Sequence, residues 1–376
     1  MPDISYSLEI GGSPAPPSLL AAIQQVDIED NATMADMIRL RVALGVSAEG
    51  SKWNVLDEDM FPRLTKLKIG VTIGSADAIP LISGYVIETR AEMSSVPGQS
   101  VLAVMGMDPT VLMHLEEKVK SWPNMADSDV ASAIFSDAAY GFTPVVDATK
   151  WKRNQDDQTL IQRGSDIQFL QQLAEHNGFE CFVELNDSSG DVEGHFHAPK
   201  HEQSPQGVLS VNMGSATNVN AFSARFDMLS ATTAKVTGLD VESGSDQPAD
   251  ITSAEQAGLG STKSTETDHP RKVLLSGTGM AQTGELQVLA QAVVDRSAWA
   301  IVAEGELNTV AYGGVLRAKR PVSVRGAGRQ FSGTYYVEKV LHSFTPDGYK
   351  QRFTLKRNAL GLTGSEKFSD DGGLPS

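Results

Sequence analysis

The sequence holds very little cysteine and no long apolar stretch. Cys181 is the only cysteine among 376 residues, so no disulfide can form within the chain, as is typical of proteins that fold in a reducing cytoplasm. No apolar run approaches the ~20 residues that a membrane-spanning helix needs. The first residues, MPDISYSLEI, lack a basic segment followed by an apolar one. We therefore expect neither a secretory signal nor an integral membrane contact.

Basic residues are also scarce. Lysine and arginine number 31 against 47 acidic residues, which gives a formal net charge of −16. Such a surface repels phosphate backbones and anionic lipids, so we expect no stable nucleic-acid binding. The densest basic stretch, RAKRPVSVR at Arg317–Arg325, is interpreted as a strand with basic residues toward solvent. With 40% hydrophobic residues, the chain is long enough for two or three globular domains.

The first two segments of the chain differ in character. Residues 1–113 predict a β domain, because stretches such as Lys66–Ile73 alternate apolar and polar side chains with the period of a half-buried strand. Residues 114–206 predict an α+β domain. Its clearest element is a helix that begins at Ser165 or Asp166 and ends at Asn177-Gly178, where glycine permits the left-handed stop.

The remainder predicts a second β domain that is interrupted. Its parts are residues 207–242 and 305–360. Between them, residues 243–304 predict an insertion with a flexible loop and a helix, because 243–268 are rich in Ser, Gly, Thr and Asp and nearly empty of large apolar residues. Residues 361–376 predict a flexible acidic tail.

A long hairpin pattern occurs twice. The stretches Ser83–Asp108 and Phe331–Asn358 each contain Ser-Gly, a long strand, a tight turn and another long strand, and each follows a strand that ends in glycine. Ser83-Gly84 matches Ser332-Gly333, and after a one-residue gap Glu88 matches Glu338 and the turn pair Pro97-Gly98 matches Asp347-Gly348. These structural glycines are Gly84, Gly98, Gly333 and Gly348. The match predicts a duplicated β-barrel.

A duplicated barrel has a geometric consequence. A ring of three such chains would carry two similar barrels per chain and so present a pseudo-six-fold face on a three-fold object. That geometry suits an adaptor between a six-fold tube and a three-fold spike. The predicted fold is therefore mainly β with α+β insertions and two β-barrel domains per chain.

Several stretches resemble one known family. GAGRQFSGTYYVEKVLHSFTPDGYKQRFTLKRNALG resembles the closing hairpin of the phage late control protein D family, the tail baseplate hubs, and of the hub part of VgrG-type spike proteins. DQTLIQRGSDIQFLQQLAEHNGFECFVE resembles their internal α+β unit, and GHFHAPK the strand that follows. The resemblance covers most of residues 3–360.

The resemblance implies a structural role in a tail. It implies a hub in a phage tail or contractile injection system. The fold would have two tube-like β-barrel domains per chain, and three chains would form a homotrimeric, pseudo-six-fold ring with an open central channel. This ring would lie between a tail tube ring and a separate trimeric spike, beside other baseplate wedge proteins. The particle would assemble in the bacterial cytoplasm. Two alternatives stay open: a distal-tail or tail-tip protein of a non-contractile phage, and a tail-associated peptidoglycan hydrolase.

Candidate chemistry is sparse. His195 and His197 alternate along a strand and, with His201, could hold zinc, although a surface strand with solvated histidines is the expected reading. Ser276–Gly284 has glycines before a helix but lacks the residues of a phosphate-binding loop. A hydrolase would need a paired acid such as Glu175, which is expected on a solvated helix face. We expect no enzymatic activity, cofactor or metal, and interpret Cys181 as a small buried apolar group.

Overall fold

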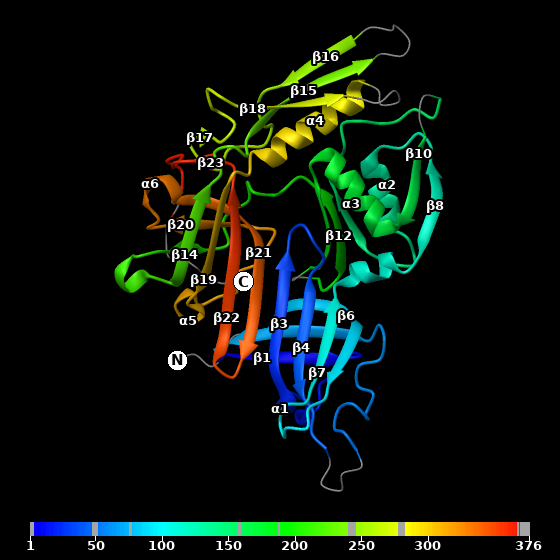
Figure 1. Ribbon diagram of the computed structural model, residues 1–376, viewed down its shortest axis with the longest axis vertical. Coiled ribbons are helices and arrows are strands. Elements are labelled where there is room, and N and C mark those ends of the chain that lie inside the picture. Colours follow the sequence, from blue (N-terminus) through cyan, green and yellow to red (C-terminus); the bar gives the residue numbers. More distant parts are fainter. Residues whose placement is uncertain are drawn as a thin grey trace.

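The computed structural model describes residues 4–46, 52–74, 77–156, 159–186, 189–239, 246–276, 283–366 and 368. The chain is mainly β, and one 13-stranded sheet joins strands from the N-terminal and C-terminal parts of the chain (Figure 1). Its order is β14-β19-β22-β21-β3-β4-β7-β6-β5-β1-β2, with β20 attached to β21 and β13 to β20. None of the helices in the described part of the chain is long and apolar enough to cross a membrane.

The first β unit comes from the N-terminal part of the chain. Its elements are β1 (Ile4–Ile10), β2 (Ser13–Pro14), α1 (Pro17–Ala22), β3 (Ile23–Asn31), β4 (Met37–Ala43), β5 (Lys66–Ile73), β6 (Ile79–Glu92) and β7 (Val101–Met107). The strands form because apolar and polar residues alternate: in β4, Ile38, Leu40 and Val42 are buried while the residues between them are not. The same core takes in Phe344 and Tyr349 from the far end of the chain.

The second β unit is assembled from distant segments. Its strands are β13 (Val208–Ser210), β14 (Val219–Phe226), β19 (Ile301–Leu307), β20 (Pro321–Arg325), β21 (Gly333–Thr345) and β22 (Gly348–Arg357). Short helices lie between them: η2 (Gly214–Ala216), α5 (Thr309–Tyr312) and α6 (Gly328–Phe331). A core of its own includes Leu209, Val324 and Leu355.

The two β units repeat one topology. Numbering six strands of each unit along the chain, β1-β3-β4-β5-β6-β7 and β13-β14-β19-β20-β21-β22, gives the same sheet order 2-3-6-5-4-1 in both. The outermost pair differs in direction, because β1 runs antiparallel to β5 whereas β13 runs parallel to β20. The predicted duplication is thus confirmed as a repeated strand order.

Backbone details repeat as well. Leu64 (φ 59°) and Lys319 (φ 66°) both adopt the left-handed conformation. Each donates its N–H to the carbonyl of a valine, Val86 or Val337, at 2.9 Å. A bulge follows each valine, and another bulge interrupts β3 and β14 at the matching place. The structure therefore equates Val86 with Val337 and Glu88 with Lys339, so the sequence alignment of Glu88 with Glu338 is wrong by one residue. In the same register Gly84 corresponds to Tyr335, so the two Ser-Gly pairs are not equivalent in the structure.

The two units do not close into separate barrels within the described residues. Instead β21 pairs with β20 through its first half and with β3 through its second half, which joins both units into one sheet. In Figure 1, β1 runs across behind β3 and β4, so the first unit curls around its core without its edge strands pairing. The prediction of two barrels is replaced by two curled halves of a common sheet.

An α+β unit lies between the repeats. It contains η1 (Pro109–His114), β8 (Glu117–Trp122), α2 (Asp127–Phe135), β9 (Thr143–Val146), β10 (Leu160–Ser165), α3 (Asp166–Asn177), β11 (Glu180–Leu185) and β12 (Val192–His197). As the sequence predicts, α3 follows an N-cap at Ser165 and stops at left-handed Gly178 (φ 70°). Its buried stripe packs on β10 and β11 around Phe196.

The insertion has a small core. β15 (Thr232–Leu239) pairs with β16 (Asp246–Ile251) and β18 (Arg271–Ser276), and α4 (Thr283–Ser297) packs on β15. Two short strands, β17 (Thr262–Lys263) and β23 (Ala359–Leu360), tie it to the chain end. The prediction of a flexible stretch is therefore wrong for the described residues 246–268, where Ala254 and Leu259 are buried. β15 belongs to this layer and not, as predicted, to the second β domain.

Part of the expected acidic tail packs on the second unit. The Gly361 carbonyl accepts from Arg357, and the Phe368 carbonyl accepts from Arg325 at 2.9 Å. Residues 369–376 lie outside the described residues.

Candidate functional site: the junction and the open sheet face

The two units meet at one strand pair, the β21–β3 junction. Its antiparallel register runs from Lys339 opposite Asn31 to Phe344 opposite Val26. Ser343 Oγ donates to Asp27 Oδ1 at 2.6 Å, and Lys339 Nζ lies 3.7 Å from Glu29 Oε1. The junction therefore combines a continuous backbone ladder with polar pairs on one face.

A buried ion cluster locks the junction from behind. Lys319 is 6% exposed, and its Nζ lies 2.8 Å from both Asp30 Oδ1 and Asp36 Oδ2. Asp36 accepts the N–H of Asn31 at 2.7 Å, and its own N–H donates to Asp108 Oδ2 at 2.7 Å. One lysine of the second unit is thus held by carboxylates of the first.

The electrostatics of this cluster favour the charged lysine. Burial opposes the charge, but the nearby Asp30 and Asp36 carboxylates raise the pKa of Lys319 above its ordinary value. Burial also disfavours the charged form of Asp30, yet Lys319 and Arg317 outweigh it and lower the Asp30 pKa. Burial and the neighbouring carboxylates Asp30 and Asp108 raise the pKa of Asp36. The cluster therefore has a structural role: the buried Lys319 ammonium of the second unit pairs with the Asp30 and Asp36 carboxylates of the first.

The joined sheet has one open face. Strands β14, β19, β22, β21, β3, β4, β7 and β6 direct alternate side chains toward the two cores, and the others toward the opposite face. In Figure 1 this opposite face of β22, β21, β3 and β4 turns toward the viewer with no helix in front of it. Its acidic residues are Asp27, Glu29, Glu88, Glu92, Glu304 and Glu306, and its basic residues are Arg39, Arg41, Arg90, Arg225, Lys339, Lys350 and Arg352.

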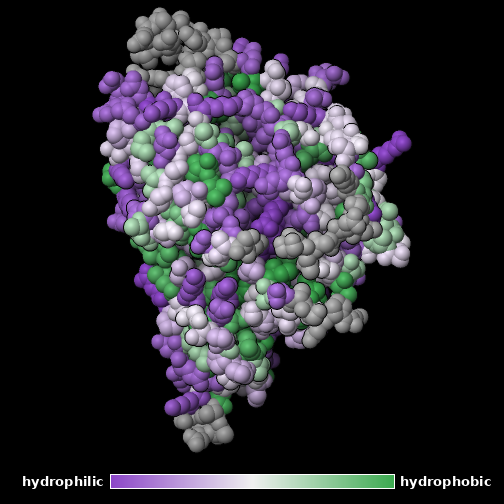
Figure 2. Space-filling view, turned by 180° about the vertical axis from the view of Figure 1, so that it is seen from behind, coloured by the Kyte–Doolittle hydropathy of each residue, from purple (hydrophilic) through white to green (hydrophobic). Residues whose placement is uncertain are grey.

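Charges of both signs alternate on this open face. Arg39 and Lys339 both lie near Glu29, at 3.9 and 3.7 Å, and Arg352 Nε donates to Glu306 Oε2 at 3.0 Å. Acidic and basic residues are nearly balanced there, although the chain as a whole carries −16. The back of the molecule mixes hydrophilic residues with small hydrophobic groups (Figure 2).

The basic stretch Arg317–Arg325 has a different place from the predicted one. Arg317 Nη1 donates to the carbonyls of Pro80 and Leu81, at 3.2 and 3.0 Å, and Lys319 is buried. Arg325 Nε donates to Ser210 Oγ at 2.8 Å. The interpretation as a strand with solvent-facing basic residues is therefore wrong for Arg317 and Lys319, which bind the protein itself.

The glycines singled out from the repeat occupy two kinds of position. A Cβ on Gly84 would lie 2.4 Å from the Met107 carbonyl oxygen, and one on Gly333 would lie 2.4 Å from Arg357 Nη2. Gly98 and Gly348 have positive φ (78° and 117°) beside open space. The first pair permits close approach at corners, and the second permits tight turns.

The histidines do not form a three-ligand site. His195 Nδ1 and His197 Nε2 lie 3.1 Å apart, which agrees with side chains on one face of β12. Both are buried, so the expected solvated strand is wrong, and burial lowers the pKa of His195 to about 3. His201 instead contacts the Pro199 and Ala257 carbonyls. No group of three or more metal-ligating side chains comes together among the described residues.

The other chemical candidates are dispersed. Glu175 is exposed and pairs with Arg296 at 3.1 Å, as expected for a solvated helix face. Cys181 is buried, as predicted, and burial raises its pKa. Most of the glycine-rich Ser276–Gly284 stretch lies outside the described residues. No spacing in the sequence indicates the Lys319 cluster, because its members come together only when the two units join.

Solved structures with this fold come from tails and a secretion system. A 43 kDa tail protein of prophage MuSo2 from Shewanella oneidensis has a TM-score of 0.66 at 14% identity, over 95% of this chain and 100% of that one. A tail protein from Neisseria meningitidis has a TM-score of 0.64 at 12% identity, over 94% and 97% of the two chains. The fold is therefore that of phage tail proteins.

A third similar structure extends the comparison. A type VI secretion component from E. coli, described as structurally similar to T4 tail proteins gp27 and gp5, has a TM-score of 0.55 at 10% identity, over 93% of this chain and 76% of that one. By sequence, residues 4–346 match the family described as the Alg8 N-terminal domain, so the chain belongs to that family. This is not the late control protein D family named from the resemblance. No curated protein matches the sequence.

Proposed function

We propose that this protein is the structural baseplate hub of a phage tail or a related contractile injection particle. The observation that carries the proposal is the repeated unit joined into one continuous sheet with an uncovered, charge-balanced face. Three copies would place six such units around an axis, with that face toward a central channel. The similar structures are tail and secretion-system components, which supports this role.

The proposed partners follow from this geometry. The pseudo-six-fold face of the homotrimer would bind the tail tube ring, and a separate trimeric spike would bind the opposite side, beside wedge proteins. The hub would assemble in the bacterial cytoplasm and become a component of the particle. Because the open face carries balanced charge, passing DNA or protein would meet no strongly attractive lining. We also propose that Gly84, Gly98, Gly333 and Gly348 serve the corners and turns of the two units.

Gene deletion, labelling of the particle and an assay on peptidoglycan should give different results for a hub and for an enzyme. Deleting the gene should abolish assembled tails or particles in the producing strain, since the tube would have no base from which to grow. Complementation should restore them, and antibody labelling should place the protein at the end of the tube. Complete tails without the protein would reject the hub proposal. Turnover of purified peptidoglycan would favour the hydrolase alternative, and a label at the tip of a non-contractile tail would favour the tail-tip alternative.

A further inference from the structure

Two edges of the joined sheet carry no partner strand within the described residues. β6 pairs with β7 along Tyr85–Glu92, but its other side pairs with β5 only up to Tyr85. The second half of β6 thus has one free edge. At the other end of the sheet, β14 pairs with β19 alone. These two edges are the ends of the eight-strand open face (Figure 1).

The repeat identifies what each free edge matches. β6 is the counterpart of β21, and β14 is the counterpart of β3, in the shared strand order. Within the chain, the second half of β21 pairs with β3. The second half of β6 and the edge of β14 therefore correspond to the two strands of the β21–β3 junction, but within the described residues they do not pair with each other. We call the pairing that they could form the second junction.

The repeat also gives the register in which β6 and β14 would pair. The matched valines and bulges equate Ser343 with Glu92, and the bulges of β3 and β14 equate Asp27 with Ser223. Since Ser343 lies opposite Asp27, Glu92 would lie opposite Ser223. By the same step, Arg225 takes the place of Glu29.

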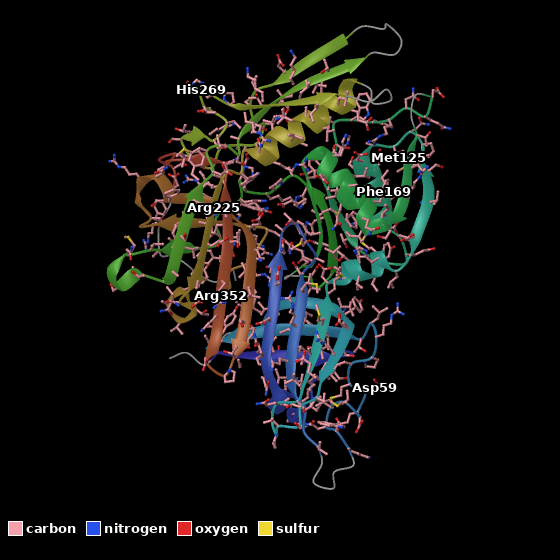
Figure 3. The ribbon with its side chains drawn as sticks, in the orientation of Figure 1. Asp59, Met125, Phe169, Arg225, His269 and Arg352 are labelled. Atoms are coloured by element: carbon pink, nitrogen blue, oxygen red, sulfur yellow. The ribbon has the colours of Figure 1, made fainter. Side chains whose placement is uncertain are left out.

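The side chains at these positions are complementary. The acidic and hydrogen-bond-accepting residues lie on β6 in place of β3, and the basic and donating residues lie on β14 in place of β21. Where Lys339 lies near Glu29 in the existing junction, the second junction would bring together Glu88 and Arg225. The Ser343–Asp27 hydrogen bond would become one between Ser223 and Glu92. Figure 3 labels Arg225 on β14, the end strand of the sheet, and Arg352 on β22. Both polar pairs of the junction are thus preserved with donor and acceptor, or charge, reversed.

The exposure of β6 and β14 also indicates that a further strand covers them. Along β21 the core-facing residues Val340, His342 and Phe344 are buried, whereas every residue from Ile87 to Glu92 of β6 is exposed. On β14, Phe222 and Phe226 are only half-buried at places where β3 is buried. An exposed, unpaired edge with partly apolar side chains is what a further strand covers.

We propose that the second half of β6 in one copy of this chain pairs antiparallel with β14 of the next copy, with Glu92 opposite Ser223 and Glu88 beside Arg225. The contact joins two different surfaces, so it propagates around a ring instead of forming a two-fold dimer. This inference rests on the proposed ring-shaped hub and names the contact that closes it. Each chain would extend the sheet of its neighbour through the same kind of strand pairing that joins β21 to β3 within one chain.

A cysteine pair tests the register. Glu92→Cys with Ser223→Cys should give covalent ladders on mild oxidation or with a short bismaleimide, both in purified protein and in assembled tails. The matched control, Glu92→Cys with Asp227→Cys, moves one thiol about 13 Å along the strand and should give almost none. Cys181 is buried in either variant. A stronger product from the control, or none from the test pair in assembled tails, would overturn the register.

A charge exchange tests the contact without new bonds. Glu88→Arg and Arg225→Glu should each weaken self-association several-fold by sedimentation, and the double exchange should restore it. Both residues are exposed, so monomer melting temperatures should stay unchanged. Additive weakening in the double variant would contradict the pairing. A chain that is trimeric yet gives no Glu92–Ser223 product would reject this contact and leave the hub role intact, whereas absence from the tail would reject the hub role.

Discussion

The first β unit passes from its second to its third strand through a tight turn, Asn31–Asp36, whereas the second unit inserts a complete helix-and-sheet layer at the same place. The strand order around the insertion is unchanged. The turn lies at the end of the sheet, where added chain leaves the ladder and the core undisturbed. The shared sheet is therefore the constant part, and the connections between its strands carry the differences.

A second contrast concerns one backbone position. Leu64 and Lys319 share the same left-handed conformation and the same hydrogen bond, but only Lys319 enters a buried ion cluster. The difference arises because the second half of β21 already has β3 and its aspartates as neighbours. The second half of β6 has no such neighbour within the chain. One unit is thus completed internally, and the other presents an open edge.

Removing the charge of Lys319 should have the largest effect. Lys319→Met keeps the side-chain length but leaves Asp30 and Asp36 buried without their cation, so the free energy of unfolding should fall by about 3–5 kcal/mol. Chemical denaturation monitored by fluorescence would measure it. The exposed Lys350→Met on β22 is the matched control and should change stability by less than about 0.5 kcal/mol. Equal effects of the two variants would show that the cluster does not join the units.

The buried His342 should make stability depend on acidity, while its counterpart in β6, Ala91, cannot. Burial lowers the His342 pKa from 6.5 to about 3. The Arg317 charge also lowers this pKa, and the Asp30 charge opposes the shift. The unfolded chain therefore binds more protons between these values, and stability is lost as pH falls below 6.5. His342 should contribute a slope of about 1.4 kcal/mol per pH unit in this window.

The variant His342→Gln isolates that contribution. It keeps a polar partner for the Tyr349 hydroxyl, which lies 2.7 Å from His342 Nδ1. Urea unfolding at several pH values between 7 and 4 should show a shallower loss of stability in the variant than in the natural chain. His195 titrates in both proteins and cancels in the difference. Identical slopes would mean that folding does not lower the His342 pKa.

The two kinds of repeated glycine should differ in sensitivity. Gly84→Ala places a Cβ against the Met107 backbone, and a shift of the strand should cost about 1–3 kcal/mol. Gly98→Ala meets open space and pays only for positive φ, about 1 kcal/mol. Melting temperatures of the two variants would rank them. A Gly98 variant as unstable as the Gly84 variant would contradict the close-approach explanation.

The smallest effect is expected on the open face. Because its charges are nearly balanced, duplex DNA should bind more weakly than about 10⁻⁵ M at physiological salt. Arg39→Ala and Arg352→Ala, one in each unit, should alter this little. A gel-shift titration measures both. Tight binding that is lost in either variant would show an attractive lining and would assign it to one unit.

Much of this protein was determined by its sequence. Alternating residues indicated the long strands of both hairpins, Ser165 and Gly178 marked the ends of α3, and the recurrence of a long hairpin after a glycine-ended strand indicated the duplication. These signals are local: periodicity, capping and turn chemistry act over a few residues, and so they can be recognised without the rest of the chain.

Tertiary structure alone decided how the pieces join. The β21–β3 junction pairs segments about 300 residues apart, and it buries Lys319, which the basic stretch around it placed in solvent. The separation of β14 from β15, and the small core of the insertion, likewise arise from strands that are distant in sequence. Such pairing depends on which edges are left free after local folding, and neither composition nor spacing records that.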